Sequence, residues 1–301
     1  MPSPAPSAPN RTLLGILFMC AASSLFPVMN GIVQLLSVRY SSEQIVWARV
    51  VSHLIFILAL FGPALGVAII RTTQLKWQIG RSIVLLMSTM FFFSGVKHLV
   101  LAKAASISFT APFIVALLAW PMLGERISPS RLLAVTVAFL GVLVVIQPGG
   151  EVFQWASLLI LGSAICYALY QIFTRRVAGH DLPETSAVYS ALVGTLVMTA
   201  VVPFVWIMPH SWGDAALLFS LGILGGLGHY CVARAMTYAQ ASVLAPFMYW
   251  QMVGSVIVGY VLAGLLPDVS TWIGAAIIIC AGVYIAWLET RPRPAVVSAP
   301  R

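Results

Sequence analysis

Residues 105–123 read ASISFTAPFIVALLAWPML, an apolar run of 19 residues without one charged side chain. A helix of roughly 20 apolar residues spans the hydrocarbon core of a bilayer, and comparable runs recur along the 301 residues of the chain. Hydrophobic residues make up 60% of the sequence and charged residues only 8%, whereas soluble domains carry about 25% charged residues. The composition excludes a soluble enzyme, a nucleic-acid-binding domain and a disulfide scaffold, and it predicts an all-α polytopic membrane protein.

Ten apolar stretches follow one another, separated by breaks that carry proline, glycine or charge. They lie near residues 12–36, 45–62, 79–97, 105–123, 131–147, 155–175, 185–208, 214–233, 240–265 and 271–288. Two breaks, 97–104 and 232–239, are nearly as apolar as the stretches they separate, so fewer and longer spans are the alternative. The end segments 1–11 and 289–301 are predicted to be cytoplasmic tails, and the first of them, rich in Pro, Ser and Ala, to be disordered.

The positive charges test this scheme, because Lys and Arg collect in cytoplasmic loops. We therefore interpret the net charge of +8 as a sign of topology and not of a nucleic-acid partner. With the N-terminus inside, three cations, Arg39, Lys97 and Lys103, fall outside and eleven fall on the cytoplasmic side. The eleven are Arg11, Arg71, Lys76, Arg81, Arg126, Arg131, Arg175, Arg176, Arg291, Arg293 and Arg301. This bias predicts that both termini are cytoplasmic and that the number of spans is even.

The sequence also repeats itself. Residues 105–113 match residues 239–247 at five of nine positions, including an Ala-Pro-Phe triplet in each. The match divides the chain into two halves of five spans, 12–147 and 155–288. An odd number of spans makes the second half insert upside down, which gives the inverted repeat of many secondary transporters. We therefore predict ten transmembrane helices as two inverted five-helix repeats, with chance similarity between apolar segments as the alternative.

The chain contains no recognisable catalytic or metal-binding pattern. It has neither a Gly-Lys phosphate loop nor a His-Glu-x-x-His motif. Its eight acids sit at or near span ends, whereas a proton relay needs an ionisable group inside the bundle. The four cysteines lie in apolar runs and are interpreted as packing residues. We expect no catalytic residue, no metal, no cofactor and no proton-relay carboxylate.

Two prolines mark a candidate site. Pro112 and Pro246 occupy equivalent positions in the fourth and ninth stretches. Each removes a backbone hydrogen bond, and in lipid the freed carbonyl must be satisfied by a neighbour or line a cavity. In inverted halves the two breaks would meet near the midplane, where such transporters bind their substrates; a tolerated kink is the alternative for either. Phe109 on the Pro112 face and Trp250, one turn beyond Pro246, are candidates to contact a solute, although Trp250 could equally pack against lipid or another helix.

Glycines 222, 225 and 226 recur at helical spacing and predict close approach of a neighbouring helix. The next position on that face is His229, interpreted either as a hydrogen-bonded packing residue or as a cavity group. Asn30, Tyr170 and Gln171 lie inside their stretches and could hydrogen-bond a polar solute. Arg49, about one turn into the second stretch, is expected to extend outward to the membrane surface.

Residues 98–146 carry a family resemblance. Their most recognisable parts are Pro112, the sequence Leu-Gly-Glu-Arg at 123–126 and the Gly-Val pair at 141–142. The stretch resembles the signature half-domain of the EamA type in the drug/metabolite transporter superfamily; the second half is similar more loosely, with Val-Gly-Tyr at 258–260 where the first has Gly-Glu-Arg. The resemblance implies ten helices in two inverted repeats, a bacterial inner membrane, and a central cavity lined by the first, third, fourth, sixth, eighth and ninth helices. Within the superfamily the chain is most similar to amino-acid exporters of the YddG type.

The leading functional hypothesis is a secondary transporter that exports neutral or aromatic amino acids by alternating access, without proton coupling. Its partners would be a small-molecule substrate and the lipid bilayer, and it would be a monomer or weak homodimer. One alternative is a carrier of phosphorylated anions that uses Lys97, Lys103, Arg49 or Arg234. Proton-coupled drug efflux is another, although residues 12–36 lack the acid that small multidrug members use. A membrane scaffold or receptor subunit that moves no solute is the last.

Overall fold

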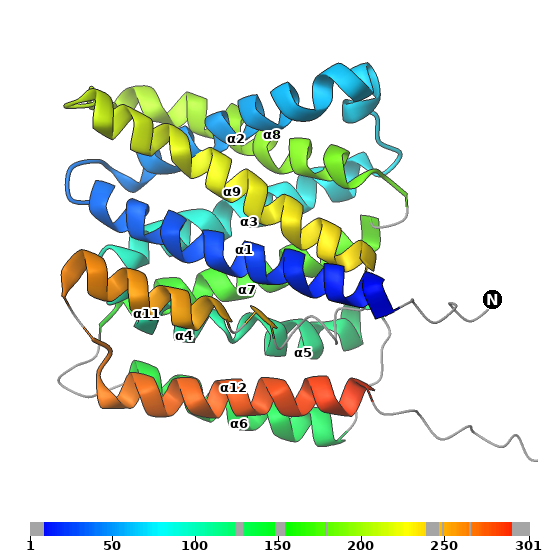
Figure 1. Cartoon of the computed structure of the whole chain (residues 1–301), viewed down its shortest axis with the longest axis vertical. Coiled ribbons are helices and arrows are strands. Elements are labelled where there is room, and N and C mark those ends of the chain that lie inside the picture. Colours follow the sequence, from blue (N-terminus) through cyan, green and yellow to red (C-terminus); the bar gives the residue numbers. More distant parts are fainter. Residues whose placement is uncertain are drawn as a thin grey trace, which may run out of the picture.

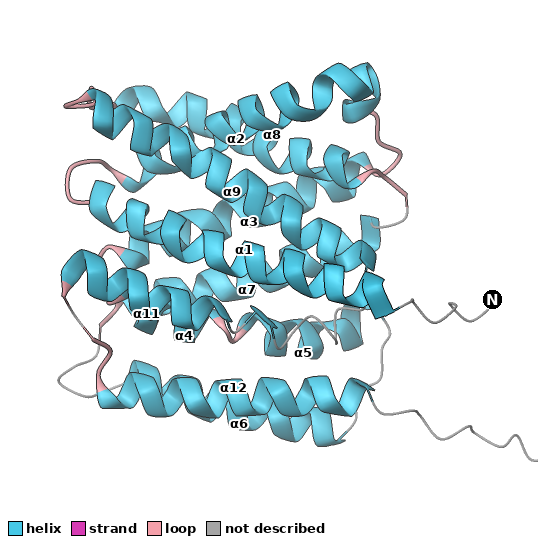
Figure 2. Ribbon diagram, viewed as in Figure 1, coloured by secondary structure: helices cyan, strands magenta, loops and turns pink. Residues whose placement is uncertain are grey.

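The computed structural model describes residues 9–123, 129–147, 154–177, 180–238, 247–248, 250–264 and 266–290. Every element described there is a helix (Figure 2). The α-helices are α1 (Pro9–Leu36), α2 (Ser42–Leu65), α3 (Leu75–Val96), α4 (Leu101–Ser108), α5 (Ala111–Leu123), α6 (Pro129–Ile146), α7 (Ala156–Val177), α8 (Pro183–Val201), α9 (Trp212–Tyr238), α11 (Trp250–Ala263) and α12 (Val269–Thr290). Two 3₁₀ turns, η1 (Gly66–Ile70) and η2 (Val202–Phe204), follow α2 and α8.

The described helices confirm the all-α polytopic membrane fold. Six of them are long and apolar enough to cross a membrane, and four shorter apolar helices accompany these in the described ranges. The six are Leu13–Leu36, Ser42–Ile70, Leu75–Val96, Ala156–Thr174, Pro183–Phe204 and Trp212–Val232. Ten crossings and cytoplasmic termini stay predictions, but α1 begins and α12 ends on the same side of the bundle, as those predictions require (Figure 1). The weak break expected at 232–239 is helical as far as Tyr238, where α9 ends.

The stretch 105–123 is not one continuous helix. It divides between α4 and α5, because Pro112 has no N–H to donate to the carbonyl one turn earlier. Phe109 N–H still bonds to the Ala105 carbonyl at 3.1 Å, and the Phe113 N–H bonds to the Thr110 carbonyl at 3.0 Å. The chain thus turns at residues 109–110, within an otherwise apolar helical segment.

Helices from the two halves of the chain pair with each other. The pair α1 and α9 and the pair α3 and α7 form the most extensive contacts, and α2 packs on α8. Helices α6 and α12 lie together at one end of the bundle, next to α4 and α5 (Figure 1). Each of the four pairs α1–α9, α3–α7, α2–α8 and α6–α12 joins an element of the first half to one of the second, which is the pattern that two related halves produce.

Close packing of α9 against α2 depends on the three glycines. A Cβ atom on Gly222 would overlap the Ser52 hydroxyl and the His53 backbone nitrogen. A Cβ on Gly225 would lie 3.1 Å from Nε of Arg49, and one on Gly226 would lie 3.1 Å from Cδ2 of His53. The glycines therefore let the α9 backbone touch the face of α2 that carries its polar side chains.

Polar contacts also join the helix ends. In the α1–α2 turn, the Tyr40 hydroxyl donates to Oδ2 of Asp214 at 2.6 Å and accepts the His210 N–H at 2.9 Å. At the opposite end of the bundle, Asp181 accepts hydrogen bonds from the Thr72 hydroxyl and from Nε2 of Gln78, the latter at 2.7 Å. These contacts connect loops that lie far apart in the sequence.

Candidate functional site

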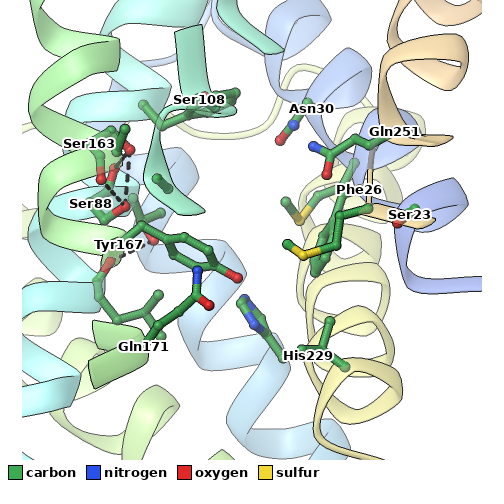
Figure 3. Close-up of a pocket in the computed structure, with 18 of the residues that line it drawn as sticks. Ser23, Phe26, Asn30, Ser88, Ser108, Ser163, Tyr167, Gln171, His229 and Gln251 are labelled. Carbon is green, nitrogen blue, oxygen red and sulfur yellow. Dashed lines mark hydrogen bonds between the residues drawn. The ribbon is translucent and has the colours of Figure 1, made fainter. Parts of the chain in front are cut away.

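A cavity of about 160 Å³ lies among α1, α3, α4, α5, α7, α9 and α11, with one side chain from α2 (Figure 3). Among the described residues, α6 and α12 contribute nothing to its lining. This is the set of helices that the family resemblance implies, with the second helix added through Arg49. The turn at residues 109–110 brings Phe109 to the cavity, because the helix is interrupted there.

Aromatic rings form much of the wall. Phe26 of α1 and Tyr167 of α7 face each other across the space (Figure 3), and Phe92, Phe93 and Phe109 complete the aromatic lining. Tyr167 stacks on Tyr170 with ring centroids 5.5 Å apart. Rings in such surroundings bind flat apolar groups by stacking and edge contacts.

Neutral polar groups alternate with these rings. They are Ser23, Asn30, Ser88, Ser108, Ser163, Gln171 and Gln251 (Figure 3), together with Thr89. Nε2 of Gln171 is buried and has no hydrogen-bond partner in the described part of the chain. The amide groups can both donate and accept hydrogen bonds, whereas the hydroxyls donate to backbone carbonyls and can still accept. The wall therefore suits a solute that carries several hydrogen-bonding groups.

Ser88 and Ser163 fasten α3 to α7 beside the cavity. The Ser163 hydroxyl donates to the Ser88 carbonyl at 2.8 Å, and the Ser88 hydroxyl donates to the Ser163 carbonyl at 3.0 Å. The two hydroxyl oxygens are also 3.0 Å apart. A reciprocal pair of hydrogen bonds therefore joins α3 and α7 in this wall of the cavity.

One cation lines the cavity among the described residues. Arg49 is only 5% exposed, so the expectation that it extends to the membrane surface is wrong. Its Nη2 lies 3.1 Å from Nε2 of His229, and its Nη1 donates to Oγ1 of Thr89 at 3.4 Å. The α9 glycines explain the position, since Gly225 leaves room for the guanidinium.

The site residues proposed from sequence fall into two groups in the structure, those that line the cavity and those that do not. Asn30, Phe109, Gln171 and His229 line the cavity. Tyr170 lies behind Tyr167, and its hydroxyl accepts a hydrogen bond from Nη2 of Arg81 at 3.1 Å.

The tryptophan and the prolines stand apart. Trp250 is 52% exposed, is not part of the lining, and donates from Nε1 to the Ser24 hydroxyl at 3.1 Å. Pro112 belongs to α5, but its side chain is not described, and Pro246 lies outside the described residues.

Of the four cations considered for an anionic substrate, Lys97 is exposed at a helix end and Lys103 is buried in α4 away from the lining. Arg234 lies 3.8 Å from Glu184 and donates to the Tyr230 hydroxyl at 2.8 Å. Only Arg49 of these four reaches the cavity.

Sequence reasoning missed Ser23, Ser88, Ser163 and Tyr167. Single hydroxyls in apolar helices usually satisfy themselves on their own backbone, so no spacing distinguishes those that face a cavity. Sequence reasoning also did not reveal that Arg81, which it counted among the cytoplasmic charges, is a buried residue of α3.

The sequence of this chain matches a known protein family. The model of the EamA-like transporter family matches residues 13–147 and again 154–287. A riboflavin transporter of Vibrio cholerae is 26% identical over 95% of this chain and 97% of its own length. An S-adenosylmethionine uptake transporter of Rickettsia prowazekii is 28% identical over 91% and 92%, and a pseudopaline exporter of Pseudomonas aeruginosa is 26% identical over 90% and 95%.

A crystal structure of a protein with 19% sequence identity aligns with a TM-score of 0.63, covering 94% of this chain and 98% of that one. At this identity the alignment supports the fold alone. The apolar helices and the bacterial relatives together identify a multi-pass protein of the bacterial inner membrane. Because the family model covers both halves, the chain belongs to the EamA-like transporter family.

Proposed function

We propose that this transporter carries small aromatic metabolites that bear several hydrogen-bonding groups, by alternating access around the central cavity. The observation that carries the proposal is the lining, in which aromatic rings alternate with hydroxyl and amide side chains. A flat ring would lie between Phe26 and Tyr167, and the polar part would bond to groups such as Asn30 and Gln171.

Three kinds of solute have this build. Aromatic amino acids combine a ring with a polar backbone, and they are the substrates expected from sequence. Riboflavin, which names the Vibrio cholerae relative, combines a larger flat ring system with a chain of hydroxyls. S-adenosylmethionine, the solute named for the Rickettsia relatives, also has a flat purine ring and hydroxyls, and in addition a positively charged sulfonium. No carboxylate lines the cavity among the described residues, so neither this sulfonium nor the ammonium group of an amino acid meets a negative side chain there.

Alternating access is supported by the pairing of helices between the two halves, because a cavity between related halves can open to either side. The rearrangement would then occur around the cavity between the two repeats, 12–147 and 155–288. Relatives are named for both uptake and export, so we propose a carrier whose net direction, including the export expected from sequence, follows the solute gradient.

Counterflow in proteoliposomes tests the function. Vesicles preloaded with unlabelled solute should exchange labelled tryptophan or riboflavin, and empty vesicles without protein should not. Labelled S-adenosylmethionine tests whether a solute with an additional cationic centre is also carried. Failure of both tryptophan and riboflavin to exchange would contradict the proposal.

A further inference from the structure

Arg49 is a buried cation with incomplete hydrogen bonding. Its guanidinium has five N–H groups, and the described contacts use two of them, toward His229 and Thr89. Nε of Arg49 is buried without any partner. The contact with Thr89 is long, at 3.4 Å, and the Thr89 hydroxyl donates its own hydrogen bond to the Leu85 carbonyl.

Arg81, in α3, shows what a satisfied arginine looks like in the same bundle. It is 2% exposed, and all five of its N–H groups donate hydrogen bonds, at 2.8 to 3.2 Å. The acceptors are Gln78, Tyr170, Thr174, Ser186 and Ser190. Arg81 is not part of the cavity lining, whereas Arg49 is. The incomplete arginine is thus the one that a solute can reach.

The neighbours of Arg49 supply no negative charge. Because arginine has only donors, Nε2 of His229 must accept its hydrogen bond, which leaves the ring proton on Nδ1 and the imidazole neutral. The Phe93 ring, 5.9 Å from the guanidinium carbon, gives a weak cation–π contact. No ion pair to Arg49 occurs among the described residues. A buried charge without a counter-ion is costly, and a bound anion would remove that cost.

We infer that Arg49 binds a carboxylate group of the transported solute, so that among the aromatic solutes proposed above the preferred substrates are carboxylic acids, amino acids included. This inference rests on the proposed function and names the substrate class of the same cavity. A carboxylate offers two acceptor oxygens in the spacing of a guanidinium edge, and such pairs form short, charge-assisted hydrogen bonds. A single cation matches one negative charge, which favours a carboxylate over a doubly charged phosphate.

Calorimetric titration of the purified protein with indole-3-acetate and indole-3-acetamide tests this without any substitution. The two compounds share the ring and differ in one group, which is a charged carboxylate in the acid and a neutral amide of similar shape in the other. The acid should bind at least about tenfold more tightly than the amide, since a charge-assisted bond is at stake. Equal affinity for the two would overturn the inference.

Substitutions locate the effect. Arg49→Gln should weaken binding of the acid at least about tenfold and leave the amide unchanged, which abolishes the preference. Arg49→Lys, which keeps the charge, should restore part of it. Arg39→Gln removes the same charge from a loop outside the cavity and is the matched control, with the preference retained. An Arg49→Gln protein that still prefers the acid would overturn the inference.

The two proposals fail in different ways. If labelled tryptophan and riboflavin exchange in vesicles but the acid and the amide bind with equal affinity, the protein is a carrier of aromatic solutes and Arg49 does not bind their carboxylate. If no aromatic solute binds or exchanges, the proposed function itself falls. Where Arg49→Gln does not fold, as judged by size-exclusion chromatography, the comparison of acid with amide on the unaltered protein still decides.

Discussion

Nη2 of Arg49 lies 3.1 Å from Nε2 of His229, across the contact between α2 and α9. The contact exists because α9 presents glycine at positions 222, 225 and 226: a Cβ on Gly222 would overlap α2, and a Cβ on Gly225 or Gly226 would crowd the Arg49 or His53 side chain. His229 also meets Phe26 edge-on, with ring centroids 5.3 Å apart. One imidazole therefore holds both a cation and an aromatic wall of the cavity.

His229 is expected to position Arg49. Replacing His229 by Ala removes the best acceptor of the guanidinium, so affinity for indole-3-acetate should fall about tenfold while affinity for indole-3-acetamide stays the same. Replacing His229 by Gln supplies an amide oxygen as a new acceptor and should restore most of the affinity. Calorimetric titration of both variants checks this, and an equal loss for acid and amide would point to general damage instead.

Tyr167 and Trp250 should behave in opposite ways. Tyr167→Ala removes a ring from the cavity wall and should weaken binding of tryptophan about tenfold, the order of an aromatic contact plus its buried area. Trp250 is half exposed and outside the lining, so Trp250→Ala should leave affinity unchanged. Counterflow over a range of tryptophan concentrations measures both. A larger effect of Trp250→Ala than of Tyr167→Ala would mean that the solute binds at the exposed face of α11 that carries Trp250 and not in the cavity.

Gly222→Ala tests the helix contact. The added methyl would overlap the Ser52 hydroxyl and the His53 backbone, and overpacking of this kind costs about 1–3 kcal/mol. The matched control is Gly62→Ala, because nothing lies within 4 Å of a Cβ there. Thermal unfolding in detergent should show a lower midpoint for Gly222→Ala only. A midpoint equal to that of the unaltered protein would mean that α2 and α9 separate at little cost.

We expect the contact that Asp181 makes between two loops to weaken in acid. Burial raises the pKa of Asp181, but hydrogen bonds from Thr72 and Gln78 outweigh it, and the net pKa lies below the ordinary 3.8. A carboxyl with a lowered folded-state pKa stabilises the fold above its unfolded pKa, and that contribution disappears as the pH falls through the folded value.

Unfolding midpoints should therefore drop as the pH falls below 3.8. In Asp181→Asn, which cannot ionise, the midpoint should be lower at neutral pH and the drop smaller. Identical pH profiles for the two proteins would show that ionisation of Asp181 does not contribute to the pH dependence of stability.

Uncoupled transport is the last prediction. No carboxylate lines the cavity among the described residues, so we expect tryptophan counterflow to be the same with and without a pH gradient across the vesicle membrane. A protonophore is the control for residual gradients. Exchange that stops when the gradient collapses would show proton coupling.

The sequence predicted the class of fold because hydropathy and charge are properties of whole segments. It also anticipated the break near Pro112, since the missing N–H of proline is local chemistry, and the close contact at the α9 glycines. It was wrong about Arg49, since the rule for arginine near a helix end says only that the side chain can reach the surface. Whether it does depends on the neighbour, and glycine at position 225 on a distant segment decides that.

The cavity residues were predicted less well for the same reason. Asn30, Gln171 and His229 stood out as polar groups in apolar stretches, and they line the cavity. Tyr167 and Tyr170 are three residues apart on one helix, and sequence favoured the second, which lies behind the first and bonds to Arg81. Which of two such neighbours faces the solute is set by the rotation of α7 against α3, a tertiary property.

Ser88 and Ser163 make α3 and α7 a single mechanical unit. Two hydroxyl groups donate across their interface in opposite directions, and in the low dielectric of a protein interior such bonds are costly to break. In the α1–α9 interface Gly228 packs directly against the Phe26 ring, a contact that involves no hydrogen bond. We therefore expect α3 and α7 to move together when the bundle changes shape, and the α1–α9 contact to shift more readily.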